Sequence, residues 1–231
     1  MKRAIILGIS GQDGAYLADL LLEKGYEVHG TDRIEVPINK ESLAYLGIDE
    51  KIQYHNLDLS HYEDILNIIE RLKPDEIYNL ASISSVGESF EHPILTTEIN
   101  GLSALKLLEA VRRIDPAIRI FQASSSEMFG VPLSIPQSEK TEFYPRSPYA
   151  NAKLFAHHSI INYREAFDLF ACSGIMFNHE SPIRGLGFVT RKITNSMARI
   201  KNGLQEKLIL GNLSVKRDWG YAKEFVEAMW L

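Results

Sequence analysis

Short apolar runs alternate with amphipathic helical patterns over most of the chain. The runs that have the length and residue types of buried parallel strands lie at 3–8, 26–31, 51–57, 76–80, 117–123 and 169–177. Apolar residues recur at helical spacing in 15–24, 62–72, 94–113 and 148–167. The alternation predicts an α/β fold, with a Rossmann-like doubly wound parallel sheet.

One helical segment contains an unfavourable pair. Asn100 and Gly101 stand in the middle of 94–113, where both residue types lower helix propensity. We therefore expect Asn100 to serve packing or a hydrogen bond.

The rhythm changes after about Gly187. The pattern predicts an amphipathic basic helix at 189–202, a short strand at 208–210 and a helix that begins near Tyr221. That last pattern meets no stop signal, so we expect it to continue beyond the given sequence. We predict a dinucleotide-binding Rossmann domain that carries the catalytic residues at 1–177. At 178–231 we predict the start of a smaller, incomplete C-terminal substrate-binding region.

A glycine-rich turn follows the first strand. The residues Gly8-Ile9-Ser10-Gly11-Gln12-Asp13-Gly14 space their glycines as GxxGxxG between a strand and a helix. Glycine keeps such a turn tight and lets the backbone approach a pyrophosphate, while the helix N-terminus offers N–H groups to the anion. The segment predicts dinucleotide binding; the alternative is a glycine-rich turn in another α/β fold.

The end of the second strand bears on the identity of the dinucleotide. Asp32 stands where an acid hydrogen-bonds the ribose hydroxyls of NAD, but Arg33 follows, and an arginine there can bind the 2′-phosphate of NADP. These residues leave NAD and NADP both open.

Two further strand ends face the same expected edge of the sheet. Asp58 follows the third strand and is placed to meet the adenine edge. The small residues 81–85 follow the fourth strand, where small side chains let a ligand lie against the backbone, although a simple turn has the same composition.

Tyr149 and Lys153 lie four residues apart near the start of a predicted helix, so they share a helix face. Ser147 and Pro148 are typical of N-cap and N1 positions. A neighbouring cation is expected to lower the pKa of a phenol. With Ser125 and Glu127 upstream, these side chains predict an acid–base centre. The alternative is an ordinary solvated helix face.

Composition narrows the partners and the compartment. The chain has 231 residues and a formal net charge of −5, so it lacks the broad basic footprint of a nucleic-acid-binding protein. A single cysteine excludes an intramolecular disulfide, suggests no cysteine-based metal cluster and favours the cytoplasm. No segment approaches the roughly 18 apolar residues of a transmembrane helix.

These features together resemble the extended short-chain dehydrogenase/reductase family of nucleotide-sugar enzymes. The strings GISGQDG, FYPRSPYANAKLFAH, FNHESPIRG, FVTRKIT, LGNL and KRDWGYAKEFVEAMWL are similar to the GDP-mannose dehydratases of that family. The resemblance implies conversion of GDP-mannose, or a close nucleotide sugar, to its 4-keto-6-deoxy form. The expected route is an internal hydride transfer through bound NADP, with NAD possible because of Asp32, in a homodimer or homotetramer.

The resemblance also implies roles for residues. Tyr149 matches the active-site tyrosine, Lys153 its partner, and Glu127 the base at carbon C5 of the sugar. Ser125 stands where the family usually has threonine, and its hydroxyl keeps the role. The motifs and the resemblance together predict as cofactor-binding Gly8, Gly11, Gln12, Asp13, Gly14, Asp32, Arg33, Asp58, Leu59, Leu80, Ser84, Tyr149, Lys153, His179 and Arg184. They predict as substrate-binding Ser85, Asn178, Lys192 and Arg217.

The sequence departs from the family in the loop after the second strand. The family's loop is often longer and carries paired arginines, whereas this chain reads Thr31-Asp32-Arg33-Ile34. The departure affects two expectations that the resemblance implies: the preference for NADP and the contact of this loop with a neighbouring subunit of a tetramer. Two other interpretations are a nucleotide-sugar epimerase or 4-keto reductase, which Glu127 argues against, and a silent nucleotide-binding scaffold, which the intact catalytic set argues against.

Overall fold

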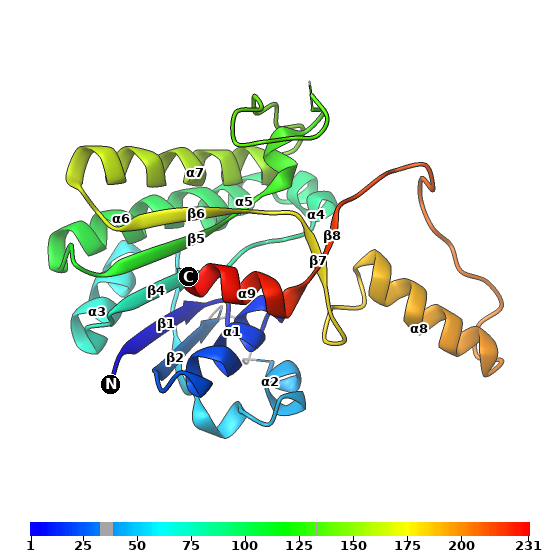
Figure 1. The fold of residues 1–231 in the computed structure, drawn as a ribbon, viewed down its shortest axis with the longest axis horizontal. Helices are drawn as coiled ribbons and strands as arrows, with labels where there is room; N and C mark the ends of the chain where they lie inside the picture. Colours follow the sequence, from blue (N-terminus) through cyan, green and yellow to red (C-terminus); the bar gives the residue numbers. More distant parts are fainter. Residues whose placement is uncertain (33–38, 133) are drawn as a thin grey trace.

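The computed structural model describes residues 1–32, 39–132 and 134–231, and its centre is a parallel sheet (Figure 1). The strands are β1 (Arg3–Leu7), β2 (Glu27–Asp32), β3 (Gln53–Asn56), β4 (Glu76–Asn79), β5 (Arg119–Ser125) and β6 (Ala171–Met176). Their order is β3-β2-β1-β4-β5-β6. The order reverses between β1 and β4, which creates the crevice where open α/β sheets bind ligands. The predicted Rossmann-like sheet is confirmed.

Helices cover both faces of the sheet (Figure 1). One face carries α3 (Tyr62–Leu72), α6 (Ser103–Ile114) and α7 (Pro148–Phe167), and the other carries α1 (Gln12–Glu23) and α9 (Ala222–Trp230). Because alternate side chains of a strand point to opposite faces, Ile5 of β1 packs in the first core and Ile6 in the second. The apolar runs are therefore buried on both sides, as parallel strands require.

The remaining elements are short or lie outside the sheet. They are α2 (Glu41–Tyr45), α4 (Val86–Glu91), α5 (Pro93–Thr97), α8 (Val189–Lys201), the 3₁₀ turns η1 (Asp49–Lys51) and η3 (Ser126–Phe129), the π-helical turn η2 (Glu98–Leu102), and the strands β7 (Asn178–Glu180) and β8 (Trp219–Tyr221). The predicted helices 62–72 and 148–167 are confirmed to the residue.

The predicted helix 94–113 is interrupted by the π-helical turn η2, which contains Asn100 and Gly101. The Asn100 side chain accepts a hydrogen bond from the Ile83 N–H at 2.8 Å and donates one to the Ile83 carbonyl at 2.9 Å. Asn100 is buried. The Asn100 amide thus satisfies both backbone groups of Ile83, which lies in the segment after β4. This confirms the expected hydrogen-bonding role of Asn100.

We expect Asn100→Ala to lower the free energy of unfolding by roughly 2–4 kcal/mol, because it leaves two buried backbone groups of Ile83 unsatisfied. Urea denaturation followed by circular dichroism measures the change. Asn151→Ala, at an exposed position of α7, is the matched control and should change stability by less than about 0.5 kcal/mol. Equal stability of the two variants would contradict this role for Asn100.

The C-terminal segment differs from the prediction at one strand. Residues 208–210 form no strand, and Ile209 is 66% exposed. A three-residue apolar run needs a partner strand, and among the described residues none pairs with it. Instead β7 pairs in parallel with β8, and α9 returns to pack on α1. The boundary after residue 177 stays a prediction, and α8 lies away from the sheet at the right of Figure 1.

Candidate active site

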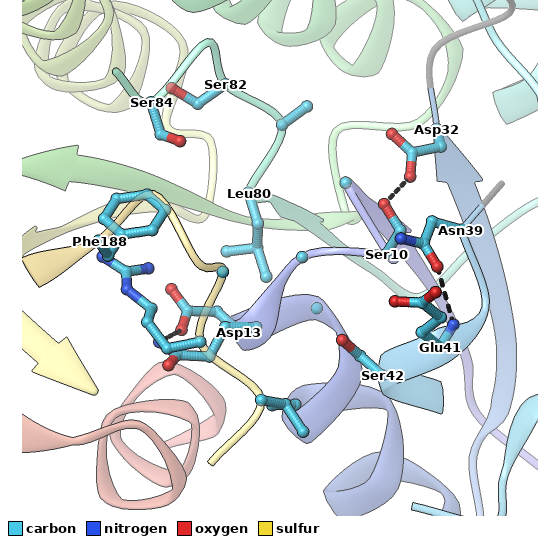
Figure 2. Close-up of a pocket in the computed structure, with 18 of the residues that line it drawn as sticks. Ser10, Asp13, Asp32, Asn39, Glu41, Ser42, Leu80, Ser82, Ser84 and Phe188 are labelled. Carbon is cyan, nitrogen blue, oxygen red and sulfur yellow. Dashed lines mark hydrogen bonds between the residues drawn. The ribbon is translucent and has the colours of Figure 1, made fainter. Parts of the chain in front are cut away.

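A cavity of about 960 Å³ lies at the carboxyl ends of β1, β2 and β4, beside the point where the strand order reverses. Figure 2 shows Asp32, Asn39 and Glu41 on its right side, Ser82, Ser84 and Phe188 on its left, and Asp13 between them. Of the predicted cofactor residues, the cavity is lined by Gly8, Gly11, Gln12, Asp13, Gly14, Asp32, Asp58, Leu59, Leu80, Ser84 and Arg184.

The glycine-rich turn forms the floor of the cavity. Gly8 has φ +86°, and a Cβ there would lie 2.9 Å from the Ala81 nitrogen. A Cβ at Gly14 would lie 2.4 Å from the Gly8 carbonyl oxygen. Both glycines are therefore required for the turn to pack against α1 and β4. Gly11 is the N-cap of α1 and supplies no side-chain cap, so the first N–H groups of the helix suit an anionic ligand.

One end of the cavity is polar and acidic. Ser10 donates a hydrogen bond to Asp32, and the Asn39 side chain accepts one from the Glu41 N–H at 2.9 Å (Figure 2). Glu41 and Ser42 also line this end. Sequence reasoning missed Ser10, Asn39, Glu41 and Ser42. Arg33, which was predicted to contact the cofactor, lies outside the described residues.

The other end of the cavity is formed by the small residues after β4 and by the turn after β7. Arg184 forms an ion pair with Glu180 at 3.3 Å, and its guanidinium lies 3.5 Å from the centre of the Phe188 ring. Ser82 and Ser84 line the same end. The Ser82 hydroxyl oxygen is buried and has no hydrogen-bond partner among the described residues.

The four predicted catalytic residues come together beside this second end. Ser125 ends β5, and its hydroxyl accepts a hydrogen bond from the Glu127 N–H at 3.2 Å. Tyr149 and Lys153 lie in the first turns of α7, and Lys153 Nζ is 5.8 Å from the centre of the Tyr149 ring. None of the four lines the cavity itself. Ser82 lines the cavity and lies near enough to Tyr149 for its hydroxyl to affect the pKa of the phenol, although it forms no hydrogen bond with it.

The helix start that positions Tyr149 follows the sequence prediction. The Ser147 hydroxyl accepts a hydrogen bond from the Ala150 N–H at 3.1 Å, and Pro148 occupies the first helical position. These two residues fix the direction in which α7 leaves the loop. The predicted N-cap and N1 positions are confirmed.

The expected lowering of the Tyr149 pKa is wrong for this structure. Burial raises the pKa of Tyr149, and the hydroxyls of Ser125 and Ser82 and the charge of Arg184 offset only part of that effect. The Lys153 Nζ donates a hydrogen bond to the Ala123 carbonyl at 3.0 Å. Burial also lowers the pKa of Lys153 to about 8. Both groups are thus shifted toward their neutral forms.

His179, also predicted to contact the cofactor, does not line the cavity. It is buried in β7, and its two ring nitrogens lie 2.7 Å from the Phe177 carbonyl and 2.7 Å from an Asp13 carboxylate oxygen. Gln12, the neighbour of Asp13, makes two further contacts with this segment. It donates a hydrogen bond to the His179 carbonyl at 3.1 Å and accepts one from Ser181, which follows β7, at 2.8 Å. His179 therefore contacts the glycine-rich turn through Asp13 without lining the cavity.

The predicted substrate residues are dispersed. Ser85 is the N-cap of α4, Asn178 begins β7, and Lys192 and Arg217 are exposed. From α8, the cavity is lined instead by Arg191 and Asn195. The basic amphipathic pattern of 189–202 carried this signal, but periodicity alone does not tell which face of a helix meets the ligand.

The parallel sheet, the glycine-rich turn at its switch point and the group of Ser125, Tyr149 and Lys153 define a nucleotide-binding protein of the short-chain dehydrogenase/reductase class. A family model described as GDP-mannose 4,6 dehydratase matches residues 5–231. The chain belongs to the GDP-mannose 4,6-dehydratase family.

Relatives and solved structures agree with this assignment. The chain is 52% identical over 240 residues to GDP-mannose 4,6 dehydratase 1 of Arabidopsis thaliana, covering all of this chain and 66% of that protein. It is 48% identical to GDP-mannose 4,6 dehydratase of Cricetulus griseus, covering all of this chain and 64% of that protein. The chain thus spans slightly less than two thirds of these relatives' lengths.

Among solved structures, the Thermus thermophilus UDP-glucose 4-epimerase in complex with NAD is similar with a TM-score of 0.82 and 25% identity, covering 98% of this chain and 72% of that chain. The dTDP-glucose 4,6-dehydratase of Bacillus anthracis str. Ames in complex with NAD has a TM-score of 0.83 and 19% identity, covering 99% and 70%. At these identities the similarity shows the fold.

Among the described residues, none of the helices has the length and hydrophobicity needed to cross a membrane.

Proposed function

We propose that this chain carries the cofactor-binding and proton-transfer part of a dehydratase that converts GDP-mannose to GDP-4-keto-6-deoxymannose, the first step towards GDP-deoxyhexoses. Family membership supports the substrate and the reaction. The observation that carries the chemistry is the grouping of Ser125, Glu127, Tyr149 and Lys153 beside a cavity with a glycine-rich turn.

The proposed roles follow from the chemistry of each side chain. A nicotinamide dinucleotide would be held by the glycine-rich turn and Asp32. When bound it would supply the hydride transfer that oxidises C4 and, after water has left and as C5 regains a proton, reduces C6. Tyr149 removes the proton from the C4 hydroxyl of the sugar, and Ser125 hydrogen-bonds the same oxygen. Glu127 removes the C5 proton, which the neighbouring 4-keto group acidifies, and returns a proton to the C6 hydroxyl as it leaves as water.

Glu127 distinguishes this reaction from its alternatives. Its carboxylate lies close enough to Tyr149 to raise the pKa of the phenol, although burial is the larger cause. A C4 epimerase or a simple 4-keto reductase needs no carboxylate at this position, because neither reaction removes the C5 proton.

We expect Glu127→Gln to slow loss of water by about 10²-fold, because the amide removes the general base but keeps the size of the side chain. Mass spectrometry of GDP-mannose incubated with the full-length protein, without added reduced cofactor, measures the loss of one water. The matched control is Glu142→Gln, a carboxylate of the loop before α7 that does not line the cavity.

If the Glu127→Gln variant eliminated water at the wild-type rate, Glu127 would have no part in the mechanism. Unchanged substrate mass with bound nucleotide in the wild-type protein would favour a silent scaffold over the dehydratase.

We propose a nicotinamide dinucleotide as the cofactor, and NADP is the form favoured by the family resemblance. NAD is the alternative, since Asp32 lines the cavity and an acid at the end of the second strand can hydrogen-bond the ribose hydroxyls of NAD. The T. thermophilus epimerase and the B. anthracis dehydratase, whose folds this chain shares, were both solved with NAD. Identification of the nucleotide that copurifies with the protein tests the choice.

We further propose that the protein acts as a homodimer or homotetramer in the cytoplasm, and that 178–231 begins its nucleotide-sugar-binding region. The family resemblance supports the assembly, and the single cysteine supports a reducing compartment. The cavity contacts of Arg191 and Asn195 support a ligand-binding role for the segment after β7. Light scattering of the purified full-length protein measures the assembly.

A further inference from the structure

An aspartate stands at the anion-binding end of α1. Asp13 is in the first turn of this helix, directly after Gly11 and Gln12, and it lines the cavity. An acid in the first turn interacts favourably with the helix dipole. The same N-terminus is where a dinucleotide's pyrophosphate binds, so an uncompensated carboxylate there repels the ligand.

The compensating charge is on His179. Its Nε2 is 2.7 Å from Asp13 Oδ2, and its Nδ1 is 2.7 Å from the Phe177 carbonyl oxygen. An ionised carboxylate and a carbonyl are both acceptors only, whereas a neutral imidazole has a single N–H. Both bonds form together only when the ring carries two protons. With Asp13 ionised, the geometry therefore requires His179 to be an imidazolium paired with it.

The surroundings of the ring support the charged form. Burial disfavours the imidazolium, but the hydrogen bond and charge of Asp13 and the Phe177 carbonyl outweigh it, so the pKa of His179 is raised. Arg184 acts in the opposite direction, and Glu180, the next residue of β7, is paired with Arg184.

The groups of α9 and β8 that pack against the His179 ring are uncharged. The Phe225 ring of α9 stacks on His179 with centroids 4.4 Å apart, and β8 presents the backbone of Gly220. From α7, Lys153 interacts with the charge of Asp13.

We propose that His179 is a positioning residue that neutralises Asp13, so that the glycine-rich turn can accept the pyrophosphate of a dinucleotide. The pair also ties the turn to β7, the strand that precedes the Arg184 side of the cavity. The inference rests on the proposed dinucleotide site. It differs from a direct contact with the cofactor, because His179 lies outside the cavity lining.

A double-mutant cycle tests the proposal on the full-length protein. The dissociation constants of NADH and NADPH are measured by isothermal titration calorimetry at pH 7 for the wild type, His179→Gln, Asp13→Asn and the double variant. We expect His179→Gln to weaken binding of the preferred dinucleotide about tenfold, since Asp13 keeps its charge and its hydrogen bond from Gln12 at 3.1 Å but loses its imidazolium partner. The double variant should bind within about threefold of Asp13→Asn, because no charge remains to be neutralised.

The control for charge is Asp19→Asn, which removes a carboxylate from the same helix outside the cavity. It should not restore binding in the His179→Gln background. Binding that stays weak in the Asp13→Asn/His179→Gln variant would show a direct or purely structural role for His179 and overturn the proposal. Unchanged binding by His179→Gln would overturn it as well.

Two further outcomes are separable from these. Failure of the wild type to bind either dinucleotide would remove the proposed function instead. If His179→Gln does not fold, the pH dependence of binding by Asp13→Asn decides. Wild-type affinity should fall as the pH rises through the raised pKa of His179, whereas Asp13→Asn should lose most of this dependence. An undiminished dependence in Asp13→Asn would contradict the proposal.

Discussion

Tyr149→Phe should reduce turnover of GDP-mannose by about 10⁴-fold, at the upper end of what general acid–base catalysis contributes. The variant keeps the ring and loses only the hydroxyl that takes the C4 proton. Because the proposed mechanism assigns no other described side chain as base at that oxygen, the first step of the reaction stops. Mass spectrometry of the sugar nucleotide after incubation with the full-length variant measures the loss.

The burial of Tyr149 makes its hydroxyl sensitive to its neighbours. Burial raises the pKa of the phenol in this structure, and Ser125 and Ser82 offset part of the effect with their hydroxyls. The reaction therefore requires that the bound substrate and cofactor bring the Tyr149 pKa down again. Arg184 is a described cation that already acts in that direction.

The control for Tyr149 is Tyr163→Phe in the same helix. The Tyr163 hydroxyl donates to Glu109 at 3.1 Å, away from the cavity. Its removal should leave turnover within about twofold of wild type and change stability by about 1 kcal/mol. More than a tenth of wild-type turnover in Tyr149→Phe would assign the proton transfer to another group.

Local patterns in the sequence predicted the elements that carry the catalytic residues. The start of α7 follows from Ser147 and Pro148, because capping depends on neighbouring residues alone. The glycine-rich turn was equally predictable, since the tight approach of Gly14 to Gly8 leaves no room for a side chain. Both signals are contained within short stretches of the chain, so they do not depend on the rest of the fold.

Features set by distant contacts were not predictable. The helix α2 has five residues, too few for a periodic signal, and it is held by the buried Leu43. Its contribution of Glu41 to the cavity therefore had no sequence signature. The π-helical turn contains Asn100, whose side chain contacts Ile83, 17 residues earlier. The apolar run at 208–210 has the same sequence whether or not another strand pairs with it, so the sequence alone did not show that it forms no strand.

The charge state of the site was the least predictable property. The spacing of Tyr149 and Lys153 places them on one helix face, and that part of the prediction holds. Spacing does not report burial, and burial decides the direction in which both pKa values move. The pairing of Asp13 with His179 likewise joins residues 166 positions apart.

Lys153→Met should reduce turnover by about 10³-fold while it stabilises the fold at neutral pH. In the proposed reaction the ammonium stabilises the negative charge that develops on the phenolate, and loss of such an electrostatic group commonly lowers the rate by about 10²–10³. The folded protein stabilises Lys153 poorly as a cation, since the residue is 2% exposed. Removal of Lys153 leaves the Ala123 carbonyl with a second donor from Gln122 at 3.1 Å.

The stability effect has a defined pH window. Burial lowers the pKa of Lys153 from 10.5 to about 8, so between these values the unfolded chain binds more protons than the folded one. Wild-type stability therefore rises with pH across this window, and the destabilisation by Lys153 is largest below pH 8. A shift of this size corresponds to about 3 kcal/mol. At about pH 7 the free energy of unfolding of Lys153→Met should exceed that of the wild type by about this amount, and the difference should shrink as the pH approaches about 9.5.

Urea denaturation of both proteins from about pH 7 to 9.5 measures the difference, and the same preparations give the turnover. The matched control is Lys201→Met at an exposed position of α8, which should show neither the gain in stability nor its pH dependence. A stability difference between wild type and Lys153→Met that stays constant with pH would mean that Lys153 is charged in the folded protein over the whole range. In that case the ammonium would already be compensated in the resting site, and its value to catalysis would not depend on desolvation.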